Sequence, residues 1–371
     1  MSAFHGGQEW QTLPGFVEDL SVTTNGFGPP PSALSAARQS VADCHHYPPL
    51  NGEPHLSHLA AFLWGTSAAT AGKRLLLGNG ASELIDLLTR EAAASAQAAG
   101  RPLGWSPGPS ATQYKEYERS ARTAGFVDAL TAADASLVCI VNPCNPTGDY
   151  KPRAEMMAWI EAKCVDEEAQ QASGGVRAHV LIDESMLMWL GPRWQHDSLA
   201  SQHSWLMRMA ERGVLVFVLH SWTKIWACPG LRLGSCVCPT LAAAERIRAR
   251  QIPWSVNLPA LSFLSAAIRD EAYLHTTWQL TPLWNRAARD ALHAAFPQWR
   301  VRGPLWTSWL WVDTGEESTL QRALVLAREA GLPIRSGAAG YGHPTCFRMA
   351  VRSPEVTRAL VAALRKTKSK L

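Results

Sequence analysis

The chain has 371 residues, and 35 lysines and arginines against 31 aspartates and glutamates leave a formal net charge of +4. This balance gives no electrostatic argument for a nucleic-acid partner, because only the C-terminal KTKSK concentrates basic residues. The composition, 47% hydrophobic and 18% charged, excludes a disordered chain and supplies a large core for two domains. The apolar runs are too short for a membrane span and the N-terminus lacks a signal-peptide pattern, so we expect a cytoplasmic protein with no membrane partner.

Short apolar runs alternate with helical patterns over the first two thirds of the chain, which predicts an α/β fold. Because the runs are apolar throughout, we expect central, largely parallel strands that are buried on both faces. Between the first two runs, residues 82–97 place Leu84, Leu87 and Leu88 on one helical face. The expected strands cover residues 74–78, 136–143, 176–184, 213–221 and 233–239.

The pattern changes at both ends of the chain. Before Gly52, the segments GFGPPPSAL and HHYPPLNG fit no regular element, which indicates an arm that lies across the molecule. After Pro253 come long helices, a strand-like WTSWLWVD, another helix and the segment CFRMAVR. We therefore expect an arm and part of a small domain at 1–45, a large domain at 46–255 and a small C-terminal α+β domain at 256–371.

The sequence lacks the motifs of metal sites and hydrolases. Its eight cysteines are scattered, and the closest pair, Cys236 and Cys238, does not have the spacing of a zinc site. Neither H-E-x-x-H nor G-x-S-x-G is present. We expect buried free thiols and no metal.

The segment HSWTKIWACPGLRLG, which follows an apolar strand, is the most informative part of the chain. It contains Ser221, Thr223, Lys224 and Arg232. A lysine at the end of a buried strand is partly desolvated, which lowers its pKa and favours bond formation with a carbonyl cofactor. Two hydroxyls and an arginine beside it suit a phosphate. Alternatively, the lysine and the arginine are surface charges on a loop.

A second segment, LLLGNGASELIDLL, leads from a strand through a glycine turn into a helix that begins near Ala81 and Ser82. The free N–H groups and dipole of a helix start attract an anion. The segment matches neither a dinucleotide fingerprint nor a P-loop. Its alternative interpretation is a tight turn with a serine N-cap.

Two further strands end in polar residues. The segment NPCNPTG presents the amide of Asn145, and HVLIDES presents Asp183, whose buried carboxylate requires a cation. Either segment alone can be an ordinary strand end. Together with the first two segments, they supply a lysine, a phosphate cradle, an amide and a carboxylate at strand ends, which are the groups that pyridoxal phosphate (PLP) requires.

On these four segments the chain resembles the fold-type-I, PLP-dependent enzymes of the aminotransferase class I/II family. The resemblance implies a large domain with a mainly parallel, seven-stranded type of sheet between helices, plus a smaller α+β domain. It also implies that Lys224 forms the internal aldimine, that Asp183 pairs with the ring nitrogen and that Asn145 bonds the ring O3′. The cofactor phosphate would be bound by Ala81, Ser82, Ser221, Thr223 and Arg232.

Within the family, the chain is most similar to threonine-phosphate decarboxylase, followed by histidinol-phosphate aminotransferase. The similarity rests on HGG at 5–7, DLSVTTNGFGPPP from Asp19, PWSVN at 253–257 and FRMAVR at 347–352. It implies a homodimer with shared active sites. By this similarity, Tyr114 would stack its ring on the cofactor, and Tyr47 would contact the cofactor phosphate of the neighbouring subunit. Arg348 would bind the substrate carboxylate. The candidates for binding the distal group of the substrate are His5, Asn25 and Arg352.

The chain departs from the family pattern in three respects. Met186 stands where many relatives have an aromatic residue, TTNG replaces N-x-N-P in the arm, and there are sixteen tryptophans, which either fill the core or reshape the pocket. The expected reaction is decarboxylation at the α-carbon of an amino acid, and the alternative is transamination. A non-catalytic binding protein is a third hypothesis, but a scaffold has no need of the intact lysine, aspartate, asparagine and arginine.

Overall fold

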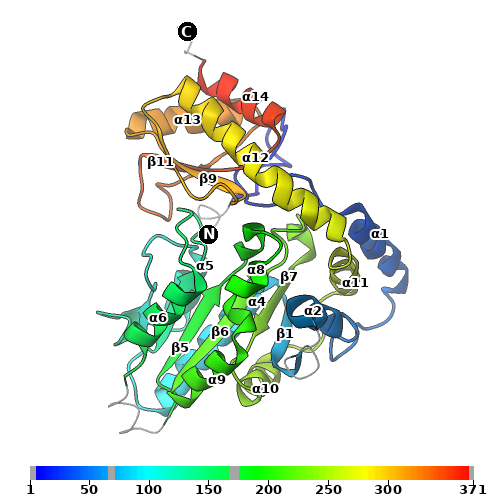
Figure 1. Cartoon of the computed structure of the whole chain (residues 1–371), viewed down its shortest axis with the longest axis vertical. Coiled ribbons are helices and arrows are strands. Elements are labelled where there is room, and N and C mark those ends of the chain that lie inside the picture. The colour runs from blue at the N-terminus through cyan, green and yellow to red at the C-terminus, as the bar shows by residue number, and fades with distance from the viewer. Residues whose placement is uncertain (1–5, 66–71, 167–174, 367–371) are drawn as a thin grey trace.

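The computed structural model describes residues 6–65, 72–166 and 175–366 (Figure 1). Its centre is a seven-stranded sheet with the strand order β1-β7-β6-β5-β4-β2-β3. This confirms the predicted α/β architecture. The strands are β1 (Leu75–Asn79), β2 (Gly104–Ser106), β3 (Val127–Asp128), β4 (Leu137–Val141), β5 (Ala178–Asp183), β6 (Val214–Ser221) and β7 (Leu233–Val237).

One strand of this mainly parallel sheet runs in the opposite direction to the others. Strands β2 to β6 pair in parallel, but β7 is antiparallel to both β6 and β1. Burial on both faces produces the same apolar run in either direction, so the run at β7 did not reveal its orientation. The short strands β2 and β3 were not predicted.

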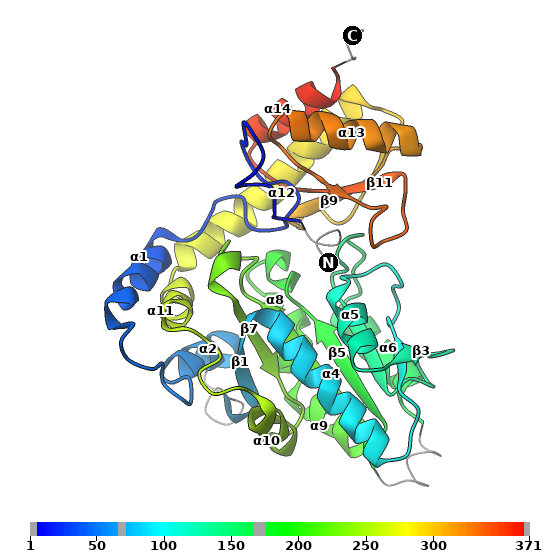
Figure 2. The same cartoon turned by 180° about the vertical axis from the view of Figure 1, so that it is seen from behind.

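Helices cover both faces of this sheet. The side chains of β4 alternate: Val138 and Ile140 pack in one apolar cluster, and Leu137 and Cys139 pack in the other. Helices α6, α8 and α9 cover the first face in Figure 1, and α4 and α5 cover the second in Figure 2. The bounds of these helices are α4 (Gly80–Ala98), α5 (Glu116–Thr123), α6 (Arg153–Cys164), α8 (Trp194–Asp197) and α9 (His203–Glu211).

The smaller unit is an antiparallel sheet of four strands in the order β10-β11-β9-β8. Its strands are β8 (Arg300–Arg302), β9 (Trp309–Asp313), β10 (Arg335–Ser336) and β11 (Cys346–Ala350). Helices α12 (Glu271–Ala295), α13 (Glu317–Glu329) and α14 (Pro354–Leu364) pack on it through a separate apolar cluster. Figures 1 and 2 show α12 running from this unit down to the large one.

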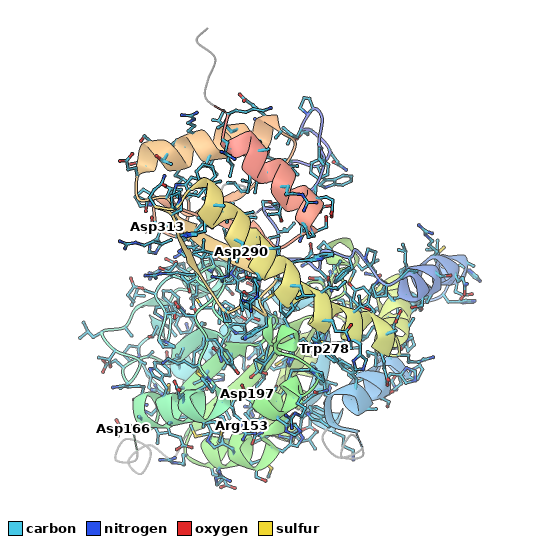
Figure 3. The ribbon with its side chains drawn as sticks, turned by 45° about the horizontal axis from the view of Figure 1, so that its top comes forward. Arg153, Asp166, Asp197, Trp278, Asp290 and Asp313 are labelled. Carbon is cyan, nitrogen blue, oxygen red and sulfur yellow. The ribbon has the colours of Figure 1, made fainter. Side chains whose placement is uncertain are left out.

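The boundaries between the units are less sharp than the expected ranges. Helix α11 (Leu258–Ala267) packs into the apolar cluster of the large unit, together with α2 (His55–Trp64), although both α11 and the start of α12 fall in the range assigned to the small domain. Trp278 of α12 donates its indole N–H to the carbonyl of Met188 at 2.8 Å, which ties the long helix to the large unit (Figure 3). The proposed domain ranges therefore remain a prediction.

The N-terminal arm is more regular than expected. Residues Pro31–Ser40, part of which we assigned to an irregular segment, form helix α1, with proline at its first position. Proline suits this position because the first N–H of a helix has no partner within the helix. Helix α1 packs along α11, so the arm continues into the helical layer.

Over the described ranges, no helix is long and apolar enough to cross a membrane. All eight cysteines are free, and all except Cys44 are buried. Helix α10 (Leu241–Arg250) of the large unit packs against α4.

Candidate active site

A cavity of about 580 Å³ lies between the large sheet, the small sheet and the N-terminal strap, which we define as residues 6–25. Ten of the site residues expected from the sequence line this cavity, although they lie far apart in the chain. They are Ala81, Ser82, Tyr114, Asn145, Asp183, Ser221, Thr223, Lys224, Arg232 and Arg348. Met186 also lines the cavity.

Lys224 lies in the turn that follows β6, with its side chain in the cavity. Burial, together with the charges of Arg348 and Arg232, lowers the pKa of the Lys224 ammonium to about 8. Its backbone carbonyl accepts a hydrogen bond from the N–H of Asn25 at 2.9 Å, so the strap holds this turn in place. A substantial fraction of this amine is therefore neutral and nucleophilic near neutral pH.

Two glycines shape an anion cradle beside Lys224. Gly80 begins α4 with φ +75°, and a Cβ at this position would lie 2.4 Å from Nη2 of Arg232. A Cβ at Gly234 in β7 would lie 2.5 Å from the backbone nitrogen of Ala81. Because neither glycine has a side chain, the start of α4 and the Arg232 guanidinium meet at one place. A helix start with free N–H groups next to a guanidinium suits a phosphate.

Asp183 ends β5 and is buried. One carboxylate oxygen, Oδ1, accepts a hydrogen bond from the N–H of Ser185 at 2.8 Å. Burial raises the pKa of this carboxyl group, and no described cation forms an ion pair with it. The ionised form is therefore stabilised by a cation that enters the cavity, such as a protonated ring nitrogen.

Arg348 of β11 is buried at the opposite sheet. Its Nη1 donates to Oδ1 of Asn145 at 2.5 Å, and its Nη2 donates to the carbonyl of Ser21. Its Nε has no partner among the described residues. The guanidinium thus connects both units and the strap and still has a donor available.

Arg335 was missed in the sequence. It pairs directly with Arg348 across β10 and β11, lines the same cavity, and its Nη2 has no partner among the described residues. Strand β10 is only two residues long, so no periodicity marks it. The only signal was an arginine after the apolar Leu332 and Ile334. Asp19 and Trp10 of the strap also line the cavity, and neither was predicted as a site residue.

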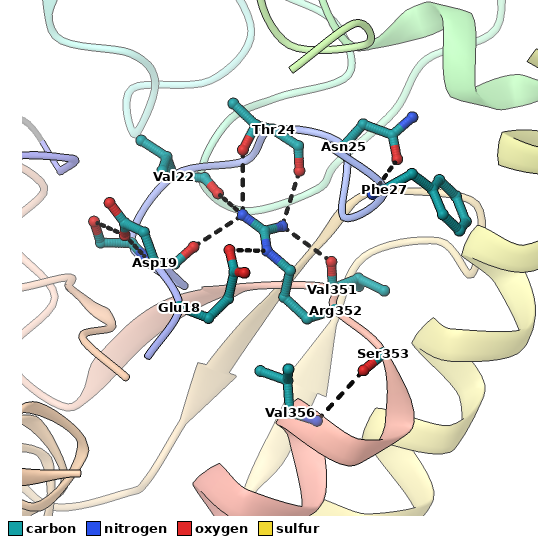
Figure 4. A network of polar contacts seen from close by, with 11 residues as sticks. Glu18, Asp19, Val22, Thr24, Asn25, Phe27, Val351, Arg352, Ser353 and Val356 are labelled. Atoms are coloured by element: carbon teal, nitrogen blue, oxygen red, sulfur yellow. Dashed lines mark hydrogen bonds and ion pairs between the residues drawn. The ribbon is translucent and has the colours of Figure 1, made fainter. Parts of the chain in front are cut away.

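Arg352 does not reach this cavity, which corrects our expectation. Its Nε donates to Glu18 at 3.0 Å, and its Nη1 and Nη2 donate to the carbonyls of Thr24 and Asp19, both at 2.9 Å (Figure 4). The carbonyl of Val22 accepts a further bond. With all three nitrogens engaged by the strap, Arg352 holds the strap in place and has no nitrogen left for a substrate.

Asn25 is likewise placed outside the cavity wall. Its Nδ2 donates to the carbonyl of Ile225 and to the Thr277 hydroxyl, so this amide fastens the strap to the Lys224 turn. Tyr47 is exposed, stacks on Trp254 and does not line this cavity. Its expected contact with a neighbouring subunit stays a prediction. His5 lies outside the described residues.

Comparison with known proteins agrees with this geometry. The model of the family described as aminotransferase class I and II matches residues 17–364. The chain belongs to this family. It is therefore a PLP-dependent enzyme, and the resemblance seen in the sequence is confirmed. The cavity fits the cofactor, because it combines a glycine-lined anion cradle, a carboxylate without a cation and an amine of lowered pKa.

The chain is similar along most of its length to several known proteins. A histidinol-phosphate aminotransferase from Cupriavidus pinatubonensis is 28% identical, covering 94% of this chain and 87% of that protein. The histidinol-phosphate aminotransferase of Sinorhizobium meliloti, solved with PLP, has a TM-score of 0.72 at 21% identity and covers 94% and 90% of the two chains. The L-threonine-O-3-phosphate decarboxylase of Porphyromonas gingivalis has a TM-score of 0.69 at 16% identity and covers 94% and 98%. Both structures share the fold.

Proposed function

We propose that this enzyme is an aminotransferase for an amino compound that carries one anionic group, with histidinol phosphate as the first candidate. The observation that carries the proposal is the pairing of Arg335 and Arg348 in the cavity of Lys224, each with an unpartnered nitrogen. Two adjacent guanidiniums suit one phosphate or carboxylate. The name of the Cupriavidus relative supports the same choice.

The residues of the cavity divide into cofactor and substrate groups under this proposal. PLP, when bound, supplies an electron sink for charge that develops at the substrate α-carbon. The cradle of Ser82, Arg232 and the start of α4 would bind its phosphate, Asp183 would hold the proton of its ring nitrogen, and Asn145 would donate to its ring oxygen. The Lys224 amine would bind the cofactor carbonyl, and as a free amine it would move the proton of the substrate α-carbon.

We expected decarboxylation from the sequence as the main reaction, but it is less well supported than transamination. O-Phosphothreonine carries a carboxylate and a phosphate, and each needs its own cationic ligands. Arg352 supplies none, since its nitrogens are engaged by the strap. Arg335 and Arg348 are adjacent, which suits the one anionic group of an amino donor such as histidinol phosphate.

We also infer that the enzyme is a homodimer. A second cavity of about 1060 Å³ is lined by Leu50, Ile252 and Trp254, all three exposed in the single chain. Tyr47 stacks on Trp254 at its border. Exposed apolar residues around one groove are typical of a protein interface. The expected place of Tyr47 at the partner's cofactor phosphate is part of this proposal, whereas the cytoplasmic location stays a prediction.

A substrate panel tests the proposed reaction. The holoenzyme is mixed with 2-oxoglutarate and, separately, with histidinol phosphate, histidine and O-phosphothreonine, and glutamate formation and carbon dioxide release are both followed. We expect glutamate from histidinol phosphate with the highest kcat/KM. Carbon dioxide from O-phosphothreonine without glutamate formation would restore the decarboxylase assignment.

A further inference from the structure

One wall of the active-site cavity comes from the N-terminal strap and takes no part in the roles assigned above. Gly6 and Gly7 lie directly on the segment 19–22: a Cβ at Gly6 would be 2.5 Å from Oγ of Ser21, and the Gly7 N–H donates to the same oxygen at 2.9 Å. Gly6, Gly7, Trp10 and Asp19 all line the cavity. The glycine pair therefore lets two parts of the strap form one continuous wall.

Asp19 brings a carboxylate to this wall. Its Oδ1 accepts hydrogen bonds from the N–H and the hydroxyl of Ser21, at 2.7 and 2.6 Å. Its Oδ2 lies beside Gly7, where a Cβ would be 3.9 Å from it. Among the hydrogen bonds and ion pairs of the described residues, none uses this second oxygen.

The other charged groups of the cavity already have assignments under the proposed function. Lys224, Arg232 and Asp183 face the cofactor, and Arg335 and Arg348 face the substrate anion. Burial lowers the pKa of Arg348, and the Asp19 carboxylate partly offsets this effect, which places the two groups within electrostatic range of each other. Asp19 is thus a negative charge on the substrate side of the cavity, and its Oδ2 forms no hydrogen bond or ion pair with the described residues.

We propose that Asp19 is a specificity-determining residue that binds, through Oδ2, an N–H donor on the substrate side chain, such as an imidazole. This inference rests on the proposed function and extends it to the side chain. Trp10, whose indole is exposed and lines the same cavity, provides an aromatic neighbour for a planar ring.

The test compares two substrates that differ only in the side chain, histidinol phosphate and leucinol phosphate, in the holoenzyme and in Asp19→Asn. Asparagine keeps an oxygen for the Ser21 N–H but loses the charge. A hydrogen bond to a charged group corresponds to about a 10- to 100-fold effect, so the kcat/KM ratio of the two substrates should fall by that factor through KM for histidinol phosphate. Glu9→Gln, which removes an exposed ion pair of the strap with Arg328, is the matched control and should leave the ratio unchanged.

The pH dependence of the ratio separates recognition from a structural role. A free imidazole titrates near pH 6.5 (roughly), and its cation binds a carboxylate more tightly than the neutral ring does. The ratio of kcat/KM for histidinol phosphate to kcat/KM for leucinol phosphate should therefore rise in the wild-type enzyme as the pH falls. Asp19→Asn should abolish this rise. Titration of the phosphate, Lys224 or the arginines affects both substrates and cancels. An equal loss for both substrates, or no change in either, would overturn the assignment.

The proposed function can fail independently of this inference. If neither compound is transaminated, the dissociation constants of both for the holoenzyme, measured by calorimetry, replace kcat/KM. Tighter binding of histidinol phosphate that Asp19→Asn removes supports the role of Asp19 even then. Equal binding of the two compounds by the wild-type enzyme would exclude it.

Discussion

Two cations near the strap show how neighbouring groups decide what a charged side chain does. At Lys224, burial and the charges of Arg348 and Arg232 outweigh the charge of Asp183, and they lower the pKa of the lysine to about 8. Arg352 is also buried, but carbonyls of the strap and Glu18 take up its nitrogens. The first side chain is thereby kept reactive, and the second is structural.

The lowered pKa of Lys224 predicts a pH profile for cofactor uptake. The neutral amine is the reactive form, and its fraction grows as the pH rises through the lowered pKa, so the rate of PLP uptake by the apo-protein should rise with a midpoint near pH 8. Stopped-flow absorbance measures this rate. Lys224→Ala should retain no cofactor after borohydride reduction, and a midpoint near 10.4 (roughly), the ordinary value for lysine, would contradict the account.

Arg335 and Arg352 form a matched pair of arginines with different predicted effects. Arg335→Gln should raise KM for histidinol phosphate by about 10-fold or more, because a charged hydrogen bond to the anion is lost, and should leave the stability unchanged. Arg352→Gln should instead lower the free energy of unfolding by about 3 kcal/mol, because it leaves buried carbonyls without donors. Steady-state kinetics and urea denaturation distinguish the two, and the reverse pattern would refute the assignment of both residues.

At the scale of elements, the site depends on where strands end and where one helix begins. Asp183 and Ser221 end the neighbouring strands β5 and β6, and Gly80 begins α4 beside them. Glu83 accepts the N–H of Asn79 at 2.6 Å, which fixes the start of the helix. The cradle is therefore a property of backbone geometry, which only glycine permits at Gly80 and Gly234.

Gly80→Ala should weaken PLP binding. The new Cβ would meet Arg232, and the residue would be strained at φ +75°, so we expect the PLP dissociation constant to rise by about 10-fold or more. Gly100→Ala, at the other end of α4, has φ +63° but nothing within 4 Å of the Cβ. This control should cost about 1 kcal/mol in stability and leave PLP affinity unchanged. Equal PLP affinity in both variants would show that the cradle is not used.

At the scale of the whole molecule, the site is assembled from the large sheet, the small sheet and the strap. The residues at the ends of β4, β5 and β6 could be predicted, because apolar runs identify buried strands and polar residues follow them directly. The direction of β7 could not be predicted, because burial on both faces erases any sign of orientation. The sequence thus predicted that β7 is buried, but not how it pairs with its neighbours.

Long-range pairing explains the other differences. Arg352 was expected to bind substrate, but the carbonyl of Thr24 that accepts its hydrogen bond lies 328 positions away in the chain. Arg335 was missed because its strand has two residues and its partner Arg348 is reached only through the fold. Such partners are set by tertiary packing, which local patterns do not contain.

The proposed dimer predicts a coupled change in mass and cofactor binding. Ile252 is 74% exposed in the single chain, so Ile252→Glu should place a charge in the interface and halve the molar mass measured by light scattering. If Tyr47 reaches the partner's site, the same variant should also bind PLP more weakly. Tyr47→Phe should keep the dimer and weaken PLP binding alone. A wild-type protein that is monomeric with full PLP affinity would refute the dimer.

The destination of the amino nitrogen tests the central claim most directly. The holoenzyme is given histidinol phosphate labelled at the amino nitrogen, together with 2-oxoglutarate, and the glutamate that forms is examined by mass spectrometry. An aminotransferase predicts labelled glutamate in amounts equal to the histidinol phosphate consumed. The absence of labelled glutamate, with carbon dioxide released from O-phosphothreonine in the same preparation, would contradict transamination and identify a decarboxylase.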